Sequence, residues 1–121
     1  MTETAMIDRG VLNGLLGSLD GDLDFLAELL QTYFDDSPRQ IAAMQAAAMT
    51  GDAEGLRRAA HTLKSNSANL GALALSAKCK DLEMMGKVGV LDGAVDKIAV
   101  VAADYAQVRA ALATSRVEAG S

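Results

Sequence analysis

Apolar residues recur at helical spacing along most of the chain, and short turn signals separate one apolar series from the next. Leu23, Leu26, Leu30 and Phe34 form one such series, and separations of three or four residues place them on one helical face. Ala, Leu and Met, which favour helices, are abundant, whereas aromatic residues, which favour strands, make up 3% of the chain. The sequence therefore predicts an all-α fold.

Turn and capping residues predict where the helices begin and end. The segment Ser37-Pro38-Arg39-Gln40 favours a break and a new helix start, because serine can cap, proline suits the first helical position and glutamine can complete a capping box. The expected helices span residues 8–18, 22–35, 38–49, 53–70, 72–85 and 92–116. Long helices with short connections predict an antiparallel four-helix bundle, here with a short additional N-terminal helix.

Glycines and the chain ends complete this plan. Gly71 is a good helix terminator, and Gly86 and Gly89 are expected to bracket a turn. The last four residues are expected to fray. We expect one domain over residues 1–121, with its core at about 8–116.

Charge and composition exclude several classes of function. A net charge of −5 argues against binding to nucleic acid. The single cysteine, Cys79, can form no internal disulfide and belongs to no zinc-binding motif. No apolar run approaches the length of a membrane span, and the first nine residues lack a signal-peptide core. We therefore expect a cytoplasmic protein, and we expect it to be a monomer.

His61 is the only histidine of the chain, and it lies within the predicted helix over residues 53–70. At about 100° of rotation per residue, the apolar side of this helix lies opposite His61. That side consists of Leu56, Ala59, Ala60, Leu63, Ser67 and Leu70. The side of His61 also carries Glu54, Arg57, Arg58, Lys64, Ser65 and Ala68. His61 is therefore predicted to point to solvent.

An isolated histidine is more often a core residue or an incidental surface residue than a functional one. The helical wheel argues against a core position for His61 but not against an incidental surface position. Lys64, three residues on, can reach the imidazole, and the small Ser65 and Ala68 leave room for another protein. Six basic residues and two acidic ones lie between Arg57 and Lys87. This local basic field suits a phosphoryl group, although a solvated helix face with chance clustering is the alternative.

The segment from Ala60 to Ala72, AHTLKSNSANLGA, resembles the signature of histidine phosphotransfer (HPt) domains, roughly His-x-Leu-Lys-Gly-x-Ser-x-x-x-Gly. The matching residues are His61, Leu63, Lys64, Ser67 and Gly71. The segment DFLAELL at residues 24–30, the Ser-Pro break and the Gly-Asp turn before the histidine helix also resemble that family. The likeness thus extends over most of the chain.

Ser65 departs from the family pattern, which has glycine at this position. The family's glycine keeps the space beside the histidine open for the receiver domain. The added hydroxymethyl group can either slow docking or hydrogen-bond the phosphoryl group, and the sequence leaves both alternatives open.

The resemblance implies a protein that relays a phosphoryl group between receiver-domain aspartates through phosphohistidine at His61. Such a protein is not an enzyme with kinase activity of its own. A neutral imidazole, with a reference pKa of about 6.5, is a competent nucleophile near neutral pH, and Nε2 is the nitrogen expected to attack. Lys64 is expected to offset the phosphoryl charge.

The expected partners are response-regulator receiver domains and a hybrid histidine kinase. We expect partner contacts from Arg57, Arg58, Ser65, Ala68, Ala72 and Lys87. No metal site and no cofactor are expected on this chain, because Mg2+ and the acceptor aspartate would come from the receiver.

Three other functions are alternatives to phosphoryl relay for this chain. A helical bundle that only binds receiver domains would show no phosphorylation, and the presence of His61 with Lys64 argues against it. A phosphoryl-accepting domain excised from a chemotaxis-type kinase would share the motif, although Met1 and the absence of an ATP-binding region favour a stand-alone protein. A metabolic enzyme is the third alternative. A single histidine is too little for its active site, because the sequence offers no metal site, no additional nucleophile and no phosphate-binding loop beside it.

Overall fold

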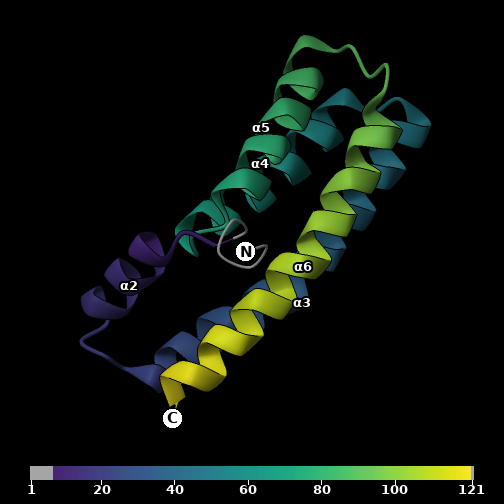
Figure 1. Cartoon of the computed structure of the whole chain (residues 1–121). Coiled ribbons are helices and arrows are strands. Elements are labelled where there is room, and N and C mark those ends of the chain that lie inside the picture. Colours follow the sequence, from purple (N-terminus) through teal and green to yellow (C-terminus); the bar gives the residue numbers. More distant parts are fainter. Residues whose placement is uncertain (1–6, 121) are drawn as a thin grey trace.

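The computed structural model describes residues 7–120, with side chains up to residue 114, and the regular structure in this range is helical (Figure 1). The helices are α2 (Arg9–Ser18), α3 (Leu23–Thr50), α4 (Ala53–Asn69), α5 (Leu73–Val88) and α6 (Ala94–Gly120). The four long helices form the bundle, and α2 lies at one end of it (Figure 1). The prediction of an all-α bundle with a short N-terminal helix is confirmed.

Aspartates begin three of the helices as the turn signals predict. Asp8, Asp22 and Asp52 accept hydrogen bonds from the backbone N–H groups of residues 11, 25 and 55. Each side chain thereby satisfies an N–H group that has no partner within its own helix. Gly51, at a φ of 75°, ends α3 just before Asp52.

The predicted break at Ser37-Pro38 is wrong, because α3 runs through Pro38 as one continuous helix. Ser37 is buried and donates to the carbonyl of Tyr33 instead of capping a new helix. Gln40 donates to Asp36 and completes no capping box. The buried face of α3 is unbroken through this region and consists of Leu26, Leu30, Tyr33, Phe34, Ser37, Ile41, Met44 and Ala47. Burial of this continuous face outweighs the cost of an exposed proline within the helix.

The predicted turn between Gly86 and Gly89 is also wrong in part. Gly86 lies inside α5, which ends only at Gly89, whose φ is 85°. A Cβ atom at position 86 would lie 2.6 Å from the carbonyl oxygen of Ala53 and 2.7 Å from the backbone nitrogen of Arg57. Gly86 therefore permits a close approach of α5 to α4 rather than a turn.

The last helix is displaced from its predicted range. It begins at Ala94, after Gly93 with a φ of 81°, rather than at Asp92. It continues to Gly120, where fraying was expected, and Ser121 lies outside the described residues.

The core is one cluster to which all the described helices contribute. Helix α4 packs on α3 and α5, and α6 closes the bundle by packing on the same two helices (Figure 1). Cys79 is fully buried in this core, and its burial raises the pKa of the thiol to about 12. Cys79 therefore packs as a small apolar residue of the core. Within residues 7–120, no helix is long and apolar enough to span a membrane.

Candidate functional site

His61 lies in the middle of α4 with 54% of its side chain exposed. The six residues predicted to form the opposite face of this helix are all buried. Leu56, Ala60, Leu63 and Ser67 are completely inaccessible, because they face α3 and α5. The helical-wheel argument is confirmed, and the imidazole is open to an approaching protein.

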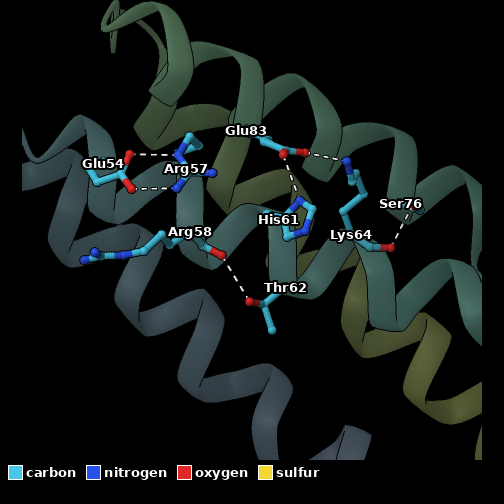
Figure 2. Close-up of polar contacts among 8 residues, drawn as sticks. All are labelled: Glu54, Arg57, Arg58, His61, Thr62, Lys64, Ser76 and Glu83. Atoms are coloured by element: carbon cyan, nitrogen blue, oxygen red, sulfur yellow. Dashed lines mark hydrogen bonds and ion pairs between the residues drawn. The ribbon is translucent and has the colours of Figure 1, made fainter.

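Glu83 on α5 links His61 to Lys64 (Figure 2). Its Oε2 lies 2.8 Å from Nδ1 of His61, and its Oε1 lies 2.6 Å from Nζ of Lys64. The Glu83 side chain is only 15% exposed. The lysine ammonium, helped by the imidazole, holds the pKa of this carboxyl below its usual value. Glu83 is therefore ionised at neutral pH.

The carboxylate decides which imidazole nitrogen is free. A carboxylate can only accept hydrogen bonds, so the proton of the neutral ring lies on Nδ1 and points at Glu83. Nε2 then carries the lone pair, and it is the nitrogen farther from the backbone. The arrangement thus presents an oriented imidazole with Nε2 free on an exposed surface.

Sequence reasoning did not find Glu83. Its only local signal is that it is one of two acidic residues between Arg57 and Lys87. Which of these two faces His61 depends on how α5 is rotated and shifted against α4, and this is a tertiary property. The close contact at Gly86 and a hydrogen bond from Ser76 to the carbonyl of Lys64, at 2.9 Å, fix that register.

The predicted contact residues on α4 differ in their surroundings. Arg57 forms a two-pronged ion pair with Glu54, with distances of 2.7 and 2.6 Å (Figure 2). Arg58 is exposed, and Ser65 and Ala68 are half-buried. Ala68 lines a hollow between α2, α3 and α4. All four therefore reach the surface of the helix that carries His61.

Two predicted contact residues need correction. Ala72 is completely buried, because it lies in the turn between α4 and α5, which the segment at Asp8 covers through a hydrogen bond to the carbonyl of Gly71. It cannot contact a partner. Lys87 is exposed as predicted, but it lies in the last turn of α5 rather than after that helix.

Comparison with known protein families assigns residues 28–111 to the model described as Hpt domain. This chain belongs to the Hpt domain family. Domains of this family carry phosphoryl groups on histidine in phosphorelays and are not kinases. The matched range includes His61, Lys64 and Glu83.

A solved structure is similar to this Hpt domain over almost its whole length. It is the crystal structure of histidine-containing phosphotransfer protein B (HptB) from Pseudomonas aeruginosa PAO1, with a TM-score of 0.85 and 33% sequence identity. The match covers 93% of this chain and 96% of the other. Comparison with curated proteins gave no match. Among the residues that the structure describes, no cluster of His, Cys, Asp and Glu could hold a metal ion in this Hpt domain.

Proposed function

We propose that His61 accepts a phosphoryl group on Nε2 from the aspartyl phosphate of one receiver domain and passes it to an aspartate of another. The observation that carries this proposal is the contact between Nδ1 and Glu83 on an otherwise exposed imidazole. It leaves a lone pair on Nε2 and places the ring where a second protein can reach it.

The proposed step is a single exchange of bonds at phosphorus. The Nε2 lone pair forms a P–N bond while the acyl phosphate P–O bond breaks, and the receiver's aspartate leaves as a carboxylate. The Nδ1 proton stays hydrogen-bonded to Glu83, so the carboxylate balances the positive charge that the ring acquires. Transfer to the next receiver is the reverse exchange.

Lys64 takes part through its ion pair with Glu83. Its ammonium lies one helical turn from His61 and offsets part of the negative charge that phosphorylation adds. The chain needs no cofactor for this role, and we expect Mg2+ to be bound by the receiver. The proposed docking surface consists of Arg57, Arg58, Ser65, Ala68 and Lys87, and a hybrid histidine kinase is the expected source of phosphoryl groups.

The test is transfer from a phosphorylated receiver domain to the wild-type chain and to His61→Gln. We expect acid-labile phosphate on the wild type and none on the variant, with unchanged helical content. Persistent labelling of His61→Gln contradicts the site assignment. Failure of the wild type to accept phosphate from any receiver domain or from phosphoramidate favours a module that only binds.

A further inference from the structure

The polar neighbours of His61 on α4 lie on two sides of it. Arg57 and Lys64 lie about 40° and 60° from His61 in one direction around the helix. Ser65 and Arg58 lie about 40° and 60° in the other direction. The first pair is on the α5 side, because Lys64 contacts Glu83 and position 86 of α5 approaches the backbone of Arg57. The second pair is on the α3 side, where Arg58 shares a hollow with Gln40 and Ala43.

The two sides differ in their charge balance. On the α5 side, Arg57 is paired with Glu54, and Lys64 is paired with Glu83 (Figure 2). On the other side, the side chains of Arg58 and Ser65 form no hydrogen bond or ion pair with any described residue. Each cation of the α5 side is therefore already held in an ion pair, whereas the guanidinium of Arg58 forms none and acts on Glu54 only through space.

Ser65, like Thr32 of α3, makes no side-chain hydrogen bond to a described residue, and this distinguishes it from most other hydroxyl residues within the helices. Ser37, Thr50, Thr62 and Thr114 each donate to the backbone carbonyl four residues earlier. The hydroxyl of Ser65 has no such bond to the carbonyl of His61 and can donate elsewhere. Helical side chains lean toward the N-terminus, so Ser65 leans toward the turn of His61, and His61 leans toward that of Arg58.

The free nitrogen of His61 points away from the paired residues of the α5 side. The two nitrogens of an imidazole ring project their N–H bond and their lone pair in widely different directions. Nδ1 points at Glu83 on α5. Nε2 therefore points away from α5. We infer that Arg58 and Ser65 hold the phosphoryl group on Nε2, the guanidinium as a charged donor and the hydroxyl as a neutral one. This inference rests on the proposed function. Of the two alternatives for Ser65, it favours a hydrogen bond to the phosphoryl group over slower docking.

Phosphorus NMR of the chain labelled with phosphoramidate tests the inference without any receiver domain. A bound guanidinium favours the doubly ionised phosphoryl group, so it lowers the pH midpoint of the phosphorus chemical shift. We expect Arg58→Ala to raise this midpoint by roughly 0.5 to 1 unit, and Ser65→Ala to raise it by less. We also expect each variant to lower the equilibrium constant for transfer from a receiver by about fivefold or less.

Two controls match these variants. Thr62→Val removes a neighbouring hydroxyl that is already bonded to the Arg58 carbonyl. Lys97→Ala removes one positive charge from α6, a helix that packs on α3 and α5. We expect both controls to keep the wild-type midpoint.

The outcomes separate this inference from the proposed function. If phosphoramidate does not label the wild type, or still labels His61→Gln, the proposed function fails. If His61 is labelled normally but Arg58→Ala and Ser65→Ala keep the wild-type midpoint, only the inference fails. A midpoint that moves in Lys64→Ala and in neither of the other two variants also contradicts it, because the phosphoryl group would then lie on the α5 side.

Discussion

A histidine on a helix surface is oriented here by one carboxylate on a neighbouring helix. Glu83 uses one oxygen for Nδ1 of His61 and the other for Lys64. The arrangement fixes the tautomer and the direction of the ring together, while more than half of the imidazole stays exposed. Orientation and exposure are both needed for transfer between two proteins.

We expect Glu83→Gln to slow phosphoryl acceptance by about tenfold, because a charged hydrogen bond to the ring is worth about 1.5–3 kcal/mol and the amide has no charge to balance the phosphorylated imidazole. Rapid-quench transfer from a phosphorylated receiver gives the rate. Asp81→Asn, on an exposed position of the same helix, is the control and should match the wild type. Equal rates for Glu83→Gln and Asp81→Asn would remove Glu83 from the proposed mechanism.

The same carboxylate should make stability depend on pH. Its pKa is lowered in the folded state from an ordinary value of 4.5, chiefly by Lys64. The stabilisation is therefore complete above the ordinary value and is lost as the pH falls through the lowered pKa. Urea unfolding from neutral pH to well below 4.5 should show a smaller loss of unfolding free energy in Glu83→Gln than in the wild type. A loss of the same size in both proteins would contradict this assignment.

From the sequence, only the features of the site that depend on a single helix could be predicted. His61, its exposure and its neighbours on α4 follow from the rotation of a single helix. Glu83 and the burial of Ala72 depend on how separate segments pack, and periodicity carries no information about that. The motif thus pointed to the exposed His61 but not to Glu83, the residue that orients its ring.

At the scale of the helices, the close contact between α4 and α5 positions the site. We expect Gly86→Ala to destabilise the fold by about 1–3 kcal/mol, because the added Cβ would meet backbone atoms that cannot move independently. Chemical denaturation measures the change. Gly14→Ala is the matched control, since a Cβ there meets nothing within 4 Å, and it should stabilise the fold by up to about 1 kcal/mol. If both variants are stabilised, the two helices do not need this close approach.

Helix α3 shows why a local signal can mislead. Ser37 and Pro38 are a valid helix start by local chemistry, but the buried face on either side of them is one continuous face. Packing against α4 and α6 stabilises one long helix more than it would stabilise two short ones. The helix starts at Asp8, Asp22 and Asp52 were predicted closely because these capping aspartates agree with the packing.

We expect Pro38→Ala to raise the unfolding free energy by about 1–2 kcal/mol. Alanine restores a backbone donor within α3, and the added freedom of the unfolded chain offsets only part of this gain. Thermal and urea unfolding measure the change, with the adjacent exposed position in Arg39→Ala as control, which should lie within about 0.5 kcal/mol of the wild type. A less stable Pro38→Ala would indicate that α3 needs the proline.

For the whole molecule, the basic field around His61 is smaller than the sequence suggests. Of the six cations between Arg57 and Lys87, three are paired with carboxylates, namely Arg57 with Glu54, Lys64 with Glu83 and Lys78 with Asp104. Arg58, Lys80 and Lys87 have no such partner among the described residues. These three residues therefore carry the positive charge of this segment that no ion pair offsets, in a chain of net charge −5.

The central claim is that His61 carries the phosphoryl group on Nε2 while Nδ1 stays protonated on Glu83. Nitrogen–phosphorus correlation NMR of the uniformly nitrogen-15-labelled, phosphorylated chain tests it most directly. We predict one phosphorus signal coupled to Nε2 of His61, with the Nδ1 proton still visible and hydrogen-bonded. Coupling to Nδ1, or phosphorus attached to any other residue, would contradict the account.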